Sequence, residues 1–375
     1  MKILHVGKFY SPIEGGIESI TRFVVETLRG NVQRIISFNN SRTAVDDDVD
    51  TVPVVRASSS GVVASQPLSL KYFFELRRSI RMFQPDVVHF HYPNPLGALY
   101  LLLSIRKENK LIVHWHSDVV AQSFLHTLIS PVERFLLKRS DAIIATSPLY
   151  RDASRQLRRH REKVTVIPCS IDETRLDLSD SEDVKVEEIR KEYGGKPIVF
   201  FIGRHVEYKG IRYLLEAERL VKRDCVFVIA GQGPLTALLK EEFKSSRIHW
   251  IGRLDDGQMR LYYHAASIFA FPSITRNEAF GVVLAEAMYC GCPPVTFTID
   301  GSGVNWVSQN GVTGIEVANR DVVAYAAAID RVLSDSGLLR TYSDNGVSRV
   351  NEMFTGRRVA DMYLRLYESL VASAT

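Results

Sequence analysis

The sequence predicts an α/β protein built from two doubly wound domains. Short apolar runs alternate with helically spaced segments, as in Lys2–Val6 followed by Ile17–Leu28. The alternation restarts at Ile198–Ile202, after an acidic stretch with few apolar residues at Asp177–Glu182. A chain of 375 residues is long enough for two domains of ordinary size. This alternation predicts parallel sheets whose ligands bind at the carboxyl ends of the strands.

The composition is that of a soluble globular protein, with 46% hydrophobic and 24% charged residues. No apolar run approaches the ~20 residues that a membrane span needs. Met1–Val6 is too short and too polar for a signal peptide. The four cysteines form no CxxC pair, so we interpret them as small buried residues in a reducing cytosol. We therefore expect a cytoplasmic protein.

The charge is unevenly distributed along the chain. Residues 1–171 contain 23 Lys and Arg against 15 Asp and Glu, a net charge of +8. Residues 172–375 contain 24 and 28, a net charge of −4. The basic N-terminal half is therefore expected to meet an anionic partner.

Two carboxylates, Glu278 and Glu286, mark the stretch that carries the most information. Glu278 follows an apolar run, Ser267–Phe271, that predicts a buried strand. Glu286 lies in a helical run that Gly291 and the prolines after it stop. Glu278 is thus expected on a loop before a helix and Glu286 inside that helix.

The start of this helix is a predicted anion site. The backbone N–H groups of Phe280 to Val283 are expected to be free and to point at a ligand above them. With Glu278 and Glu286 reaching hydroxyls on either side, a sugar, a diphosphate and a ribose in series would fit. Two glutamates eight residues apart also occur on ordinary solvated helix faces.

Three further loops follow predicted strands. Gly15 and Gly16 would let the backbone approach a ligand closely, although a simple tight turn is the alternative. Arg204 and Lys209 can converge on one anion, with a surface pair as the alternative. His116 follows the strand Leu111–Trp115, and cannot form a triad with the consecutive Ser117 and Asp118.

These motifs resemble those of the retaining glycosyltransferases of family 4, which have the GT-B fold. The resemblance rests on Glu278-x7-Glu286 with Phe280-Gly281 and Gly291-x-Pro293, and on Gly203-Arg204-x4-Lys209-Gly210. It implies two Rossmann-like doubly wound domains that face a central cleft. Residues 1–171 would form the acceptor-side domain and residues 172–356 the donor-binding domain. The C-terminal helix, residues 357–375, would cross back onto the first domain.

The resemblance also implies roles for single residues. His116 matches the family's histidine that touches the donor sugar, and His114 is expected to point the other way. Arg204 and Lys209 would bind the diphosphate, Glu278 the sugar and Glu286 the ribose. The catalytic group would be His116, Arg204, Lys209 and Glu278. The remaining donor-binding positions would be Gly15, Gly16, Arg253, Leu254, Ala279, Phe280, Gly281, Val282 and Val283.

The implied reaction is transfer of a hexose from a nucleotide diphosphate sugar to a hydroxyl of a saccharide, with retention at the anomeric carbon. We interpret the acidic triplet Asp46 to Asp48 as a solvated loop rather than a metal site, because no further ligand lies nearby in the sequence. No metal and no cofactor beyond the nucleotide sugar is therefore expected. GDP-mannose is favoured over a UDP-hexose because the chain resembles bacterial mannosyltransferases of surface-polysaccharide assembly. A sugar-nucleotide epimerase with the GT-B fold and a non-catalytic donor-binding module are the alternatives. The loop Asp300–Asn305 departs from the family pattern.

Two basic segments suggest where the acceptor lies. Lys71, Arg77, Arg78 and Arg81 surround an expected apolar face of Phe73, Leu76, Ile80 and Phe83. The second segment contains Arg151, Arg155, Arg158, Arg159, Arg161 and Lys163. Ordinary solvated helix faces are the alternative. We expect one shared basic surface that binds the inner face of the cell membrane, a lipid-linked acceptor and no nucleic acid.

Overall fold

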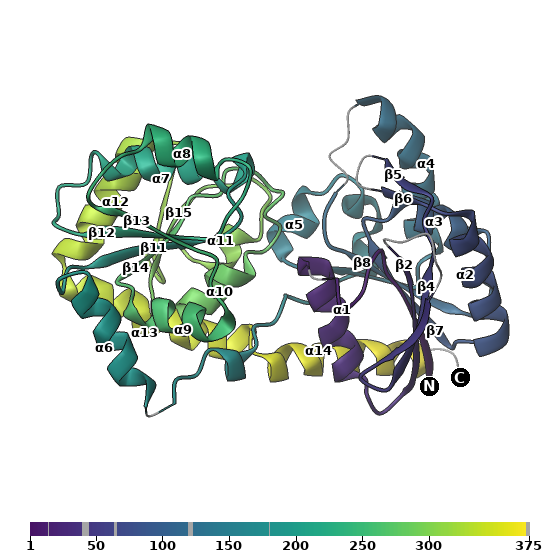
Figure 1. Ribbon diagram of the computed structural model, residues 1–375. Coiled ribbons are helices and arrows are strands. Elements are labelled where there is room, and N and C mark those ends of the chain that lie inside the picture. Colours follow the sequence, from purple (N-terminus) through teal and green to yellow (C-terminus); the bar gives the residue numbers. More distant parts are fainter. Residues whose placement is uncertain (14, 40–44, 64–65, 119–122, 180, 373–375) are drawn as a thin grey trace. The chain divides into compact units, whose positions relative to one another are not determined.

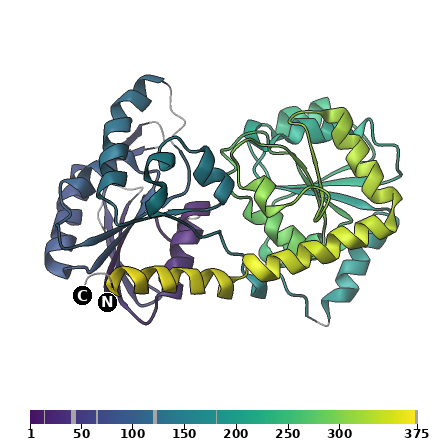
Figure 2. The ribbon, with the colours of Figure 1, turned by 180° about the vertical axis from the view of Figure 1, so that it is seen from behind.

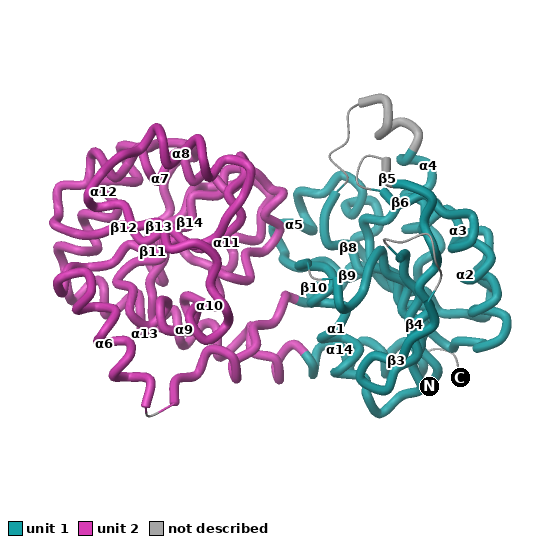
Figure 3. Tube along the Cα trace, in the orientation of Figure 1, with its two compact units in different colours: residues 1–167, 360–375 teal, residues 168–359 magenta. Residues whose placement is uncertain are grey.

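The computed structural model describes residues 1–375 except residues 14, 40–44, 64–65, 119–122, 180 and 373–375. The chain forms two compact units (Figure 3). One comprises Met1–Ile167 with Ala360–Thr375, and the other Pro168–Val359. The sequence prediction placed these transitions after residue 171 and at residue 357. The last three residues of the predicted C-terminal helix lie outside the described residues.

The first unit is a parallel sheet whose outermost strand alone is antiparallel to its neighbour, among the described residues (Figure 1). The strand order is β10-β9-β8-β7-β1-β2-β4-β3. Its strands are β1 (Lys2–Val6), β2 (Val32–Phe38), β3 (Val45–Val49), β4 (Val52–Ala57), β7 (Val87–Tyr92), β8 (Lys110–Trp115), β9 (Ala142–Ala145) and β10 (Val164–Val166). A separate hairpin joins β5 (Gly61–Val63) to β6 (Gln66–Leu68).

Helices cover both faces of this sheet. They are α1 (Gly16–Thr27), α2 (Leu70–Phe83), α3 (Pro95–Leu102), α4 (Ser123–Arg139), α5 (Pro148–Ala153), the 3₁₀ helix η1 (Leu157–Lys163) and the part of α14 (Gly356–Ala372) from Ala360 on. Successive side chains of β2 point to opposite faces of the sheet, so their contacts show which helix covers which face. Ile35 packs with Val25 of α1, whereas Phe38 stacks on Tyr72 of α2 at 3.9 Å between ring centroids. Helix α14 lies on the α1 face, where Tyr363 meets Phe23 of α1.

Two predictions for this unit were wrong. Asp46 to Asp48 were expected in a solvated loop, but they lie in β3, which pairs antiparallel with β4. An edge strand needs only backbone partners, and its exposed side chains can be charged. Helix α2 has the predicted bounds but buries Tyr72, Leu76, Ser79 and Ile80, so its buried face is rotated from the expected one.

The second unit is a wholly parallel sheet with the order β13-β12-β11-β14-β15-β16. Its strands are β11 (Ile198–Ile202), β12 (Val226–Ala230), β13 (Ile248–Gly252), β14 (Ile268–Phe271), β15 (Pro294–Phe297) and β16 (Ile315–Val317). Its helices are η2 (Glu173–Arg175), α6 (Glu182–Glu192), η3 (Glu207–Lys209), α7 (Ile211–Glu218), α8 (Thr236–Glu242), α9 (Asp256–Ala265), α10 (Val282–Tyr289), α11 (Val304–Val307), α12 (Val322–Ser334) and α13 (Ser336–Met353).

The core of this unit lies on the side of α7 and α12, where Leu214 and Ile329 pack on Val199 and Phe201 of β11. Phe200 points to the opposite face, against Tyr263 of α9. Figure 2 shows the C-terminal sheet from behind, with the yellow-green helices flanking it. None of the described helices is both long and apolar enough to span a bilayer.

The loop after β12 passes so close to the loop after β11 that it has no room for a side chain. Gly231 has φ +103°, and a Cβ built on it would collide with the carbonyl oxygen of Gly203. Gly195 also has a positive φ, +70°, but a Cβ there meets no atom within 4 Å. Comparing substitutions at the two glycines therefore separates the free-energy cost of the left-handed backbone from that of the collision.

We predict that Gly195→Ala costs about 1 kcal/mol, the penalty of a left-handed backbone. Gly231→Ala should cost ~1–3 kcal/mol more, because backbone atoms must move to admit the methyl group. The free energy of unfolding of both variants in urea measures the difference. Equal losses would contradict the close approach of the two loops.

Candidate active site

A cavity of about 920 Å³ opens at the carboxyl ends of β11, β12 and β13. Cationic side chains of Arg204, Lys240 and Arg253 line it, together with Gly203, Gly231 and the turn Gln232-Gly233-Pro234. Arg204 and Arg253 are exposed, and their side chains have no hydrogen-bond or ion-pair partner in the described part of the chain. The cavity therefore offers unneutralised positive charge where ligands bind in such sheets.

Lys209 and Glu278 meet although they are 69 positions apart. The Lys209 ammonium forms an ion pair with Glu278 Oε2, and each side chain is only 13% exposed. Ser273 Oγ donates to the same carboxylate oxygen over 3.3 Å. The Lys209 ammonium also lies 5.5 Å from the centre of the Phe271 ring. Lys209 is therefore not a free cation here, unlike Arg204.

The start of α10 has the predicted geometry of an anion site. Gly281 caps the helix with φ +88°, a conformation that favours glycine. The N–H groups of Leu284 and Ala285 bond to the Gly281 carbonyl, whereas those of Phe280 to Val283 have no backbone acceptor among the described residues. Phe280 is buried and packs edge-on against Phe354. The helix start is thus held rigidly with several donors unused.

Glu286 lies inside α10, as predicted, and accepts a hydrogen bond from the Tyr263 hydroxyl over 3.1 Å. Burial raises the pKa of its carboxyl group, and the nearby Arg175 guanidinium partly opposes that shift. A half-buried carboxylate with one donor keeps acceptor capacity for a ligand hydroxyl.

The loop that departs from the family pattern supports the Glu278 loop. Ser302 Oγ donates to the Glu278 carbonyl, and the Gly303 N–H donates to the Ala279 carbonyl over 2.9 Å. Asn305 uses its amide inside the loop: it accepts from the Ile299 N–H over 2.8 Å and donates to the Phe297 carbonyl. Asn305 therefore has a structural role here.

Gly15, Gly16 and His116 belong to the first unit. Gly15 is the N-cap of α1, and a Cβ on Gly16 would meet nothing within 4 Å. His116 lies one residue beyond β8 and is 5% exposed. A hydrogen bond of 3.1 Å joins its Nε2 to His91 Nδ1, and burial lowers the pKa of His116 to about 3. His116 is thus a neutral imidazole at pH 7.

The expected orientation of His114 was wrong. Its ring stacks on that of His116 with 3.9 Å between centroids. Residues two apart on a strand share a face of the sheet, so both histidines point the same way.

Some site residues were missed by reasoning from the sequence. Lys240 lines the cavity, but the helical run around it reads as an ordinary solvated helix. Ser273 and Ser302 contact Glu278 from different loops, and only the assembled sheet brings them there. The Gly231–Pro234 turn was the available signal for Lys240, since α8 begins two residues after it.

The chemistry that this arrangement allows is stabilisation of a multiply charged anion. Arg204, Lys240 and Arg253 supply positive charge at one side of the sheet, and α10 supplies backbone donors. Glu278 and Glu286 supply acceptors for hydroxyl groups. Polyhydroxylated phosphate esters have both features.

Two family models match the chain, one in each half. The model "Glycosyltransferase Family 4" matches residues 15–175, and the model "Glycosyl transferases group 1" matches residues 184–349. The second match contains the cavity residues, Lys209 and both glutamates.

Some similar proteins match this chain over all or nearly all of its length. The O-antigen chain mannosyltransferase C of Escherichia coli is 28% identical over 100% of both chains. The D-rhamnosyltransferase WbpZ of Pseudomonas aeruginosa is 29% identical over 95% of this chain and 92% of its own. Among solved structures, the sucrose-phosphate synthase of Thermosynechococcus elongatus has a TM-score of 0.80 at 22% identity and covers 99% of each chain. The chain therefore has the GT-B fold and belongs to the glycosyltransferases that combine a family 4 domain with a group 1 domain.

Proposed function

We propose that this glycosyltransferase transfers a hexose from a nucleotide diphosphate sugar to a saccharide during synthesis of a cell-surface glycan. GDP-mannose is the favoured donor and a UDP-hexose the alternative. The observation that carries the proposal is the group of unneutralised cations around the cavity at the ends of β11, β12 and β13. A diphosphate leaving group needs this countercharge where no metal ion supplies it.

The surface-glycan assignment and the sugar come from the relatives. The mannosyltransferase C relative is named for the O-antigen chain, and the WbpZ relative for transfer of D-rhamnose. Mannose is a hexose and D-rhamnose a deoxyhexose, so a nucleotide-linked hexose is the simplest common donor. The residues around Arg253 do not by themselves distinguish a purine from a pyrimidine.

We propose that the anomeric configuration is retained, as the resemblance to family 4 implies. Glu278 Oε2 accepts from Lys209 and Ser273, so this carboxylate is engaged rather than presented as the nucleophile that a double displacement would need. We propose front-face attack, in which an oxygen of the leaving diphosphate takes the acceptor proton. Residues Arg204, Lys209 and the start of α10 then stabilise the departing charge, and no added metal is needed.

An epimerase or a non-catalytic donor-binding module remains the alternative. An assay that separates products by mass distinguishes the three. Transfer to an acceptor sugar, with EDTA present and no added Mg²⁺ or Mn²⁺, is expected. An epimerised donor without transfer, or binding without turnover, would contradict the proposal.

We predict that Arg204→Ala lowers kcat by about 10²–10³, the effect of removing one preorganised charge stabiliser. The exposed Arg331, on α12 and outside the cavity lining, provides the control substitution Arg331→Ala. Arg331→Ala should leave kcat within a factor of about three. Steady-state kinetics with the native donor test both, and near wild-type turnover of Arg204→Ala would remove the diphosphate assignment.

The two glutamates should separate kinetically. Glu286→Ala should chiefly raise KM for the donor, because we assign Glu286 to the ribose. Glu278→Ala should chiefly lower kcat. The substitution removes a hydrogen-bond acceptor for the hydroxyls of the donor sugar and leaves the Lys209 side chain, which is only 13% exposed, without its ion-pair partner. Lys209→Ala should then lower kcat by a smaller factor in the Glu278→Ala variant than it does in the wild type. Additive losses would show that the pair does not act as a unit.

The donor base is testable without an acceptor. GDP should raise the melting temperature more than UDP at equal concentration, because the bound state gains RT ln(1 + [L]/Kd). Arg204→Ala should reduce the shift with either nucleotide. A larger shift with UDP would replace GDP-mannose by a UDP-hexose.

A lipid-linked acceptor and attachment to the inner face of the membrane are the second part of the proposal. Helix α2 supports it, since Leu70, Phe74 and Met82 are 72%, 64% and 74% exposed beside the exposed Arg77 and Arg78. Apolar side chains among cations favour an anionic lipid interface.

The expected single basic surface needs revision. Helix α2 packs over β2 and β4, whereas α5 and η1 pack at β9 and β10, at the other end of the sheet. Five strand spacings, roughly 24 Å, separate β10 from β2. In the second segment, Arg151 and Arg161 pair with Asp152, and Lys163 donates to two backbone carbonyls. We therefore assign membrane contact to α2.

We predict that vesicles with anionic lipid sediment the wild type at low salt and release it at high salt. Arg77→Glu with Arg78→Glu should abolish sedimentation. The matched pair Arg158→Glu with Arg159→Glu, on η1, should largely preserve it. A wild type that ignores the vesicles, or equal losses from both pairs, would contradict attachment through α2.

A further inference from the structure

Five histidines lie on one face of the N-terminal sheet. His5 comes from β1, His89 and His91 from β7, and His114 from β8, with His116 directly after β8. All are between 0% and 5% exposed. Their rings form a continuous layer, with centroid distances between neighbours of 3.9 to 5.7 Å. Of these five, only His116 was expected from the sequence to take part in the transfer reaction.

The tautomer of His5 is fixed by its surroundings. Its Nε2 lies 2.9 Å from Gln33 Oε1. The Gln33 amide nitrogen donates to the Val25 carbonyl over 3.0 Å, so the amide oxygen must face His5. His5 therefore donates from Nε2, and Nδ1 carries a lone pair. This buried Nδ1 has no hydrogen-bond partner among the described residues.

His89 and His91 repeat this arrangement. His89 Nδ1 lies 2.6 Å from the Tyr367 hydroxyl of α14, and His91 Nδ1 lies 3.1 Å from His116 Nε2. The Nε2 atom of each is buried and also lacks a partner in the described part of the chain. Each of the three rings thus has one nitrogen held by a neighbour and one buried nitrogen unused.

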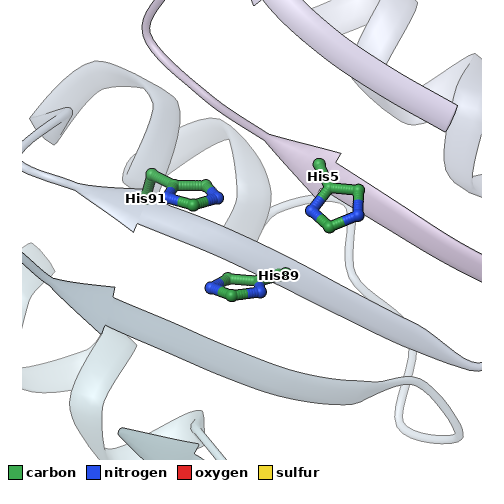
Figure 4. A group of neighbouring side chains, drawn as sticks. All are labelled: His5, His89 and His91. Carbon is green, nitrogen blue, oxygen red and sulfur yellow. The ribbon is translucent and has the colours of Figure 1, made fainter. Parts of the chain in front are cut away.

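Figure 4 shows His5, His89 and His91 side by side on the neighbouring strands β1 and β7. One ring nitrogen from each lies within 4.8 Å of the other two. We propose that His5, His89 and His91 bind a divalent late first-row transition metal ion, with zinc the ion of first choice.

The chemistry of the donor set fits this ion. Imidazole nitrogen is a preferred ligand of zinc, and three histidines with one further ligand make a known tetrahedral set. Ligating histidines are usually oriented by a partner on the other ring nitrogen, as Gln33, Tyr367 and His116 do here. Burial also lowers the pKa of His5 to about 4, so protons do not compete with a metal at pH 7.

Zinc–nitrogen bonds of about 2.0–2.1 Å place tetrahedral ligands roughly 3.3–3.4 Å apart. The three nitrogens are within 4.8 Å of one another, so each pair must close by at most about 1.5 Å. The rings of His89 and His91 are stacked within 5° of parallel, so they must also turn about their side-chain bonds to aim their lone pairs at one ion. The ion would cross-link β1 to β7 within the sheet of the first unit. We therefore assign it a structural role, and the proposed transfer reaction still needs no added metal.

The test uses the full chain, purified without a polyhistidine tag from zinc-supplemented medium. After dialysis, elemental analysis should find roughly one zinc per chain. X-ray absorption at the zinc edge should then count at least three imidazole ligands. Less than about a tenth of an equivalent, together with no melting shift on adding Zn²⁺, Co²⁺ or Ni²⁺ to chelator-treated protein, would overturn the proposal.

Variants locate the ion. His5→Gln and His89→Gln should lose the zinc and the zinc-dependent melting shift. His114→Gln is the matched control, because His114 lies in the same layer but outside the three ligands, and it should keep both. Loss of zinc from His114→Gln with retention in His5→Gln would place the ion at the neighbouring trio His91, His114 and His116 and refute the assignment. If His5→Gln does not fold, the absorption measurement on the wild type decides.

Discussion

The close approach of backbone segments at the carboxyl end of the C-terminal sheet is the constraint on which the proposed donor site depends. Side chains built on Gly210, Gly231 and Gly233 would collide with the carbonyl oxygens of Pro272, Gly203 and His205, respectively. The loops after β11, β12 and β14 therefore interlock through their main chains, which have few conformations available. Arg204 and Lys209 extend from such a loop, so their positions are set before any ligand arrives. Preorganised charge of this kind costs no rearrangement at the moment of reaction.

The ion pair of Lys209 with Glu278 sets the electrostatic balance of this site. Both side chains are 13% exposed, so neither is easily left alone. While the pair is intact, Lys209 contributes little net charge, and the attraction for the proposed diphosphate would come from Arg204, Lys240 and Arg253. An arriving sugar hydroxyl can take the place of one Lys209 contact at Glu278, which frees the ammonium for the phosphate. Binding of the sugar and binding of the diphosphate would then be coupled through the Lys209 ammonium group.

The sequence predicted the fold and the loops that carry the site, because apolar runs bounded by glycine or polar residues are strong signals for buried parallel strands. It failed where a residue's environment is set by distant partners. Asp46 to Asp48 read as a loop, yet pairing with β4 makes them an edge strand. The Lys209–Glu278 contact joins loops that become neighbours only when β11 lies beside β14. The histidine layer could not be predicted, because the sequence does not show that β1 lies between β2 and β7 in the sheet.

The histidine layer has a physical cost that apolar residues would not incur. Several buried ring nitrogens lack partners among the described residues, and each such group loses the hydrogen bonds it made in water. Valine or leucine at these five positions would pack the same strand face without that loss. His116 is the member nearest the strand ends, and its Nε2 is oriented by His91, whose ring stacks in turn on His89 at 4.5 Å. The layer therefore works as a support that fixes the tautomer and position of His116 from beneath. A metal held by His5, His89 and His91 would require the proton of His91 on Nδ1, so that His91 donates to His116. His116 would then keep the same neutral tautomer, a constraint that apolar side chains at these positions could not impose.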